Sequence, residues 1–98
     1  MNTPKWTQNQ AIAYESACEL IGHLMAIKSE QIEQIEQELG KVTPDQERIE
    51  ALRLARSALH QERTALNVTD DAEVARIRAD YGATIRAYES NLQGAQHG

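Results

Sequence analysis

Few side chains in this 98-residue chain could ligate a metal or act as nucleophiles. Glu19 and His23 are four residues apart and would share one face of a helix, where we expect a local hydrogen bond. Cys18 has no histidine beside it on the same helical turn, so we interpret it as a small apolar core residue. Metal centres in helical bundles need ligands that converge from several helices, and the chain has no Glu-x-x-His pair. The sequence therefore predicts no metal site and no cofactor.

Acidic side chains are concentrated between residues 30 and 38, where Glu30, Glu33 and Glu36 recur every third residue. A period of three drifts around a helix of 3.6 residues per turn, so these carboxylates would follow a ribbon rather than form one cluster. We interpret them as a solvated face that could also contact a protein. The alternative is an acidic surface that imitates nucleic-acid phosphates and antagonises a DNA- or RNA-binding protein.

Arg53 and His60 are separated by six residues and would lie on the same face of a helix, about two turns apart. This pair resembles the motif of the HEPN ribonucleases, in which an arginine and a histidine are separated by four to six residues. The resemblance implies an arginine that stabilises phosphate charge, a histidine that transfers protons, and a site formed across a dimer. It covers eight residues, and Leu54 stands where the family often has a polar residue. A HEPN-like ribonuclease is therefore kept as a second alternative.

The overall charge of the chain disfavours direct contact with nucleic acid. Fifteen acidic residues against ten basic ones give a net charge of -5, whereas a phosphate binder needs a basic face. The first ten residues are polar and lack the features of a signal peptide, and no apolar run is long enough to span a membrane. We expect a cytoplasmic protein that contacts neither membrane nor nucleic acid.

The hydrophobic pattern predicts an all-α fold in one domain, residues 1–98. Two prolines, five glycines and the absence of strand-like alternation leave three long helical segments, at about 7–39, 44–66 and 70–93. Short connections would fold them into an up-down-up three-helix bundle. Apolar residues recur at helical spacing and form the expected core, which includes Ile21, Leu24, Ile32, Ile35, Ile49, Leu52, Leu59, Leu66, Val74, Ile77, Tyr81, Ile85, Tyr88 and Leu92.

Capping residues give the expected helix boundaries. Thr7 with Gln10 three residues later matches a capping box at the first start. Thr43 followed by Pro44 predicts the second start, and Thr69 predicts the third. Glycines at positions 40 and 94 are expected to end the first and third helices.

The expected first helix is longer than the other two, which has a consequence for its N-terminal third. At 1.5 Å per residue it would reach about 50 Å, against about 35 Å for each of the others, so we expect this third to be uncovered. It carries an apolar and aromatic set, namely Trp6, Ile12, Tyr14 and Ala17. Aromatic side chains are favoured anchors in protein interfaces, so we expect a protein-binding surface here. A homodimer is the first expectation, and a second protein is the other.

These observations favour a non-enzymatic function. We expect a small helical adaptor, inhibitor or regulatory protein that acts by binding another protein.

Overall fold

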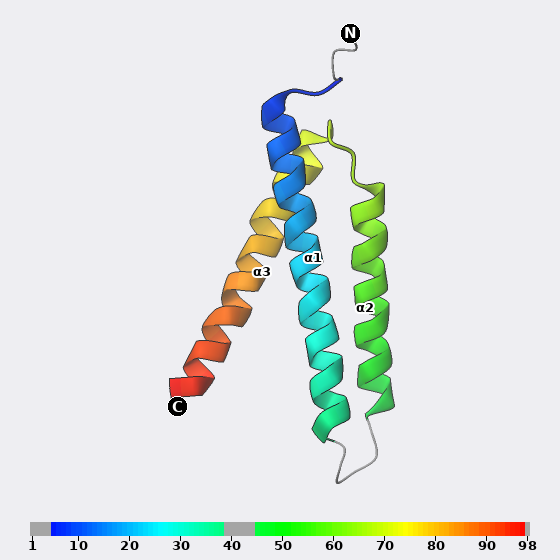
Figure 1. Cartoon of the computed structure of the whole chain (residues 1–98), viewed down its shortest axis with the longest axis vertical. Coiled ribbons are helices and arrows are strands. Elements are labelled where there is room, and N and C mark those ends of the chain that lie inside the picture. Colours follow the sequence, from blue (N-terminus) through cyan, green and yellow to red (C-terminus); the bar gives the residue numbers. More distant parts are fainter. Residues whose placement is uncertain (1–4, 39–44, 98) are drawn as a thin grey trace.

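The protein folds as three α-helices. The computed structural model describes residues 5–38 and 45–97, with side chains as far as residue 93 in the last helix. The helices are α1 (Gln8–Gln37), α2 (Gln46–Ala65) and α3 (Asp71–His97). They run down, up and down along a molecule that measures 61 × 29 × 21 Å (Figure 1). The expected all-α three-helix bundle is confirmed, and α1 is the longest helix at 30 residues.

The start of α1 is the expected capping box. The backbone N–H of Gln10 donates to Thr7 Oγ1 at 3.1 Å, and the backbone N–H of Thr7 donates to Gln10 Oε1 at 2.8 Å. Two backbone donors that a helix start would leave unpaired are thereby satisfied. The helix ends at Gln37, two residues before the expected end, with Glu38 as its C-cap. The expected stop at Gly40 lies outside the described residues.

The other two helices start one or two residues later than expected. Asp45 caps α2 by accepting the backbone N–H of Arg48 at 3.1 Å, whereas the expected cap Thr43 and first residue Pro44 lie outside the described residues. Asp70 caps α3 in place of Thr69 by accepting the N–H of Glu73 at 3.2 Å.

Thr69 is not the cap of α3 because its hydroxyl is engaged elsewhere. Thr69 Oγ1 donates to the side-chain oxygen of Asn67 at 2.7 Å. The expected end of α3 at Gly94 is also wrong, because the helix continues to His97. A glycine costs a helix only about 1 kcal/mol relative to alanine, which does not force termination.

The core is built along α1, which packs against both other helices. Near its start, Ala17 and Ile21 pack with residues from the α2–α3 connection and the start of α3: Leu66, Val74 and Ile77. One to two turns later, Leu24 and Ile27 pack against Ile85 of α3. Towards the end of α1, Ile32 and Ile35 pack against Ile49 of α2, with Leu52 beside them. The apolar face of α1 therefore turns from α3 to α2 along its length.

The backbones of α2 and α3 do not pack against each other, so α1 is the common support of the bundle. Figure 1 shows α3 diverging from α1 towards its C-terminal end. The sequence of α1 accounts for this divergence. After Ile27, its apolar residues Ile32 and Ile35 are both buried against α2, and the remaining positions as far as Gln37 are Lys, Ser, Glu and Gln. No apolar side chain in that stretch remains to hold α3. Leu92, which the spacing assigns to the core, is therefore 43% exposed, and its assignment is wrong.

The expected uncovered N-terminal third of α1 is a prediction that the structure corrects. Ala17 is fully buried, so it belongs to the core and not to a contact surface. The α2–α3 connection carries the chain to the N-terminal end of α1 before α3 begins, and Gln10 Nε2 donates to Asp71 Oδ1 at 3.0 Å. The expectation failed because it compared helix lengths and ignored how far this connection extends.

Candidate protein-binding surface and polar network

An apolar depression lies where α1 begins and the α2–α3 connection passes it. It encloses about 490 Å³ and is lined by Trp6, Ala11, Tyr14, Glu15, Leu66, Asn67 and Val68. We call it the N-terminal depression. Trp6 is 44% exposed and lines this depression. Two of the four residues expected to form the contact surface, Trp6 and Tyr14, are thus brought together.

Tyr14 connects this depression to the core. It is half-buried and packs against the cluster formed by Ala17 and Ile21. A side-chain hydrogen bond with Cys18, one turn further along α1, raises the pKa of the Tyr14 phenol. Cys18 is itself half-buried against the same cluster, in agreement with its interpretation as a small apolar residue.

The other expected contact residues are more scattered. Ile12 is 57% exposed but does not line the depression, and Ala17 is buried. Leu66 and Val68 line it, although the sequence analysis did not assign them to a surface. Both lie in the α2–α3 connection, and only the fold brings this connection next to Trp6.

The acidic ribbon on α1 is exposed, as expected for a solvated face. Its members have different neighbours. Glu33 Oε1 accepts from Gln37 Nε2 at 3.5 Å, and Glu36 lies 3.7 Å from the guanidinium of Arg53. Burial raises the pKa of Tyr88 on α3, and the nearby charge of Glu30 adds to the effect. Glu36 is therefore partly neutralised, and the three carboxylates do not form an uninterrupted anionic row.

Arg53 and His60 both line a second depression, of about 480 Å³, on α2 beside Met25 of α1. We call it the α2 depression. Arg53 lies between two carboxylates, 3.7 Å from Glu36 and 3.7 Å from Glu50. The structure therefore brings the expected pair together, with the arginine already paired to acidic groups.

No metal-binding arrangement is present in the described part of the chain. No three His, Cys, Asp or Glu side chains converge there. His23 lies 3.8 Å from Glu89 of α3, rather than pairing with Glu19 as expected. The correction arises because α3 places a carboxylate beside the histidine, and a local pattern on one helix cannot show this.

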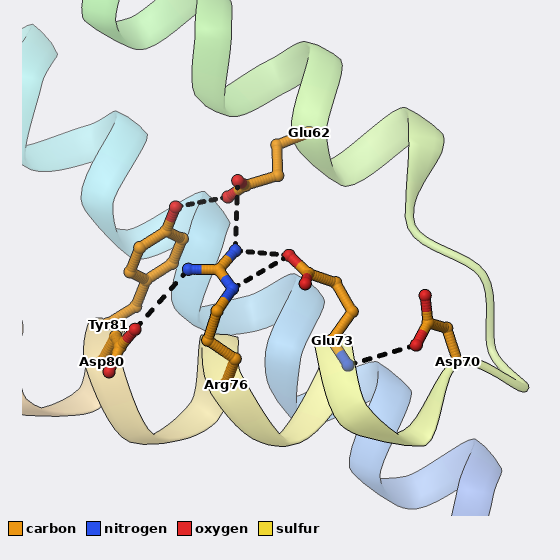
Figure 2. A network of polar contacts seen from close by, with 6 residues as sticks. All are labelled: Glu62, Asp70, Glu73, Arg76, Asp80 and Tyr81. Atoms are coloured by element: carbon orange, nitrogen blue, oxygen red, sulfur yellow. Dashed lines mark hydrogen bonds and ion pairs between the residues drawn. The ribbon is translucent and has the colours of Figure 1, made fainter.

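A polar network joins α2 to α3 where their backbones do not touch (Figure 2). Arg76 of α3 is at its centre, 3.4 Å from Glu62 of α2 and 3.5 Å from Asp80, and it also binds Glu73. The Tyr81 hydroxyl donates to the same Glu62. The guanidinium also lies 5.7 Å from the centre of the Tyr81 ring, a cation–π distance. The spacing of these residues along the sequence does not predict this network.

The network shifts the pKa values of three of its members, Glu73, Arg76 and Tyr81. The hydrogen bond from Arg76 lowers the pKa of Glu73, and the same bond raises the pKa of the arginine. Burial raises the pKa of Tyr81, and its hydrogen bond with Glu62 adds to the increase. Glu73 therefore remains an acceptor and Tyr81 a donor at neutral pH. The arrangement is a structural connection between helices.

An apolar groove of about 310 Å³ opens between α2 and α3 next to the network. It is lined by residues of all three helices: Leu24 and Lys28 of α1, Ala55, Ala58, Leu59 and Glu62 of α2, and Tyr81 and Thr84 of α3. It lies where α3 diverges from α1 (Figure 1), beside the half-buried Leu59.

Comparison with known proteins does not identify the chain. No family model, no curated protein and no solved structure matches it. Among the described residues, no helix combines the length and the apolar character that a bilayer crossing requires.

Proposed function

We propose that the protein is a small, non-enzymatic helical adaptor, inhibitor or regulatory protein of the cytoplasm, and that it binds another protein through the N-terminal depression. The observation that carries this proposal is the exposure of Trp6 at the edge of an apolar hollow. A tryptophan beside a preformed pocket is the arrangement that interface hot spots favour. The volume of about 490 Å³ would accept one or two apolar side chains of a partner.

The surroundings of the depression support binding rather than catalysis. Its polar lining residues are Glu15 and Asn67, together with the Tyr14 phenol, and none of the described residues that line it is a histidine, cysteine or arginine. The partner is a second copy of the chain or a different protein, and an experiment can distinguish the two cases. Self-association depends on protein concentration, whereas a different partner must be supplied.

The proposal is tested with Trp6→Ala, and with Leu54→Ala as a matched control. Leu54 is a large apolar residue that is 65% exposed on α2, away from the N-terminal depression. Sedimentation equilibrium of each pure variant measures self-association. Affinity capture from nuclease-treated lysate, followed by mass spectrometry, measures binding of a different protein.

We expect Trp6→Ala to abolish dimerisation or the capture of one stoichiometric partner, and Leu54→Ala to preserve it. Both variants should keep the helical circular dichroism of the wild type. If Trp6→Ala changes neither readout, or if both variants change them equally, the N-terminal depression is not the binding surface.

A HEPN-like ribonuclease is the second candidate, because Arg53 and His60 line the same depression. The resemblance implies that the arginine stabilises charge on the scissile phosphate while the histidine transfers a proton. Purified protein is incubated with a single-stranded RNA, and cleavage is compared between wild type and His60→Gln. Intact RNA, or equal cleavage by both proteins, would refute this candidate.

A further inference from the structure

Two arginine side chains of α2 contact α1 and have no carboxylate partner among the described residues. Arg56 and Arg63 are half-buried, and neither forms an ion pair there. Arg56 Nη1 donates to Ser29 Oγ at 2.9 Å, and Arg63 Nη1 lies 3.3 Å from the point where a Cβ on Gly22 would stand. The other arginines of the described chain are exposed, so these two are distinguished by their burial and not by the lack of an ion pair.

Arg56 belongs to a set of donors that converge on the α2 depression. Arg53, Arg56, Ser57 and His60 all line it and follow the i, i+3, i+4, i+7 spacing of one helix face. Arg63 Nη2 lies 3.5 Å from Nδ1 of His60. An arginine can only donate, so this contact is compatible with the tautomer of His60 that accepts at Nδ1 and donates from Nε2–H.

The rest of the lining limits what the donors can hold. Glu50 lines the same depression, and Glu36 is paired with Arg53, so a long polyanion such as the RNA of the ribonuclease candidate would meet carboxylates at this end. A compact anion is therefore the competing occupant of the same depression. No aromatic side chain lines it, which removes the stacking surface that single-stranded nucleic acid uses. A compact anionic group fits these limits, and Met25 and Leu54 offer apolar contact beside it.

We propose that the α2 depression binds the phosphate monoester group of a small molecule. Arg56 supplies a charge-assisted hydrogen bond, and the Ser57 hydroxyl and His60 Nε2–H supply further donors. The side chains of Met25 and Leu54 contact the carbon skeleton next to the phosphate. This proposal does not rest on the N-terminal depression or on cleavage of RNA.

The test is a titration of the full chain, followed by ¹H–¹⁵N NMR, with three probes: inorganic phosphate, phenyl phosphate and glycerol phosphate. We expect shifts centred on residues 53–60, and tighter binding of phenyl phosphate than of glycerol phosphate by about fivefold because its ring contacts the apolar residues. Shifts centred elsewhere, or no shift with any of the three probes, would overturn the proposal. Equal binding of the two esters would overturn the apolar contact.

Three variants locate the site. Arg56→Gln should weaken phenyl phosphate binding at least tenfold, and Ser57→Ala should weaken it about threefold. Arg86→Gln is the matched control, because Arg86 is an exposed arginine on α3 that forms no ion pair among the described residues. Ser57 is exposed, so Ser57→Ala should fold as the wild type does. It therefore still tests the site if Arg56→Gln destabilises the protein by removing the Arg56–Ser29 hydrogen bond. Equal weakening by the control and by Arg56→Gln would show general charge attraction and refute the site.

Discussion

Removing the Tyr81 hydroxyl tests whether the polar network stabilises the contact between α2 and α3. The hydroxyl donates to the Glu62 carboxylate, and their two helices share no backbone contact. A hydrogen bond to a charged group contributes about 1.5 to 3 kcal/mol to stability. The Glu62 side chain is 31% exposed, so solvent screening places the value at the lower end of this range, about 1.5 kcal/mol.

Tyr81→Phe should therefore reduce the free energy of unfolding by about 1.5 kcal/mol, measured by urea denaturation with circular dichroism. For a domain of this size the midpoint temperature should fall by about 6 to 12 °C. Tyr81→Phe, Glu62→Gln and the double variant together form a double-mutant cycle that isolates the interaction. We expect a coupling free energy of about 1 kcal/mol.

The control cycle pairs Glu62→Gln with Tyr88→Phe. Tyr88 is also half-buried on α3, but it packs against the Leu24–Ile27 cluster and lies near Glu30. Its coupling with Glu62 should be close to zero. Additive effects in the Tyr81 cycle, or equal coupling in both cycles, would refute the view that the network holds the two helices together.

Three further predictions concern stability. Ile77→Ala should destabilise the fold by about 3 to 5 kcal/mol because its side chain is fully buried, whereas Leu54→Ala at a 65% exposed position should change it by less than about 0.5 kcal/mol, both by urea denaturation. The pKa of Glu73 is lowered from 4.5 and that of Tyr81 is raised from 10.0, so stability should be lost as the pH falls below 4.5 and as it rises above 10. Thermal melts against pH should show both losses, and Glu73→Gln should flatten the acid side. Gln31 Oε1 is buried without a hydrogen-bond partner, so Gln31→Leu should raise the free energy of unfolding by about 1 kcal/mol, and an unchanged or lower value would contradict this reading.

Features encoded within a few residues could be predicted from the sequence. The Thr7–Gln10 capping box was found because both partners lie within one turn. The predicted start of α3 is one residue too early because Thr69 and Asp70 are both good N-caps. The hydrogen bond from Thr69 to Asn67 decides between them. Ile77 was correctly assigned to the core from helical spacing alone.

Features that depend on the path of a connection could not be predicted in this way. Glu62 and Arg76 are fourteen residues apart and come together only because the chain reverses between them. Leu66 and Val68 line the N-terminal depression for the same reason. Ala17 was expected on a surface because its burial requires Leu66, Val74 and Ile77 to reach the start of α1, and helix lengths do not contain that information.

The division of the apolar face of α1 explains why a chain of this size has several open hollows. A closed three-helix bundle needs every helix to pack against the other two, but α1 gives Leu24 and Ile27 to α3 and Ile32 and Ile35 to α2. The backbones of the two outer helices consequently stay apart, and their side chains meet at Leu59 of α2, which shares core clusters with α3, and in the polar network. In this network the long side chains of Arg76 and Glu62 span the distance between the two helices. The groove between α2 and α3 lies beside them. Trp6, which precedes α1, is 44% exposed beside the α2–α3 connection and lines the N-terminal depression.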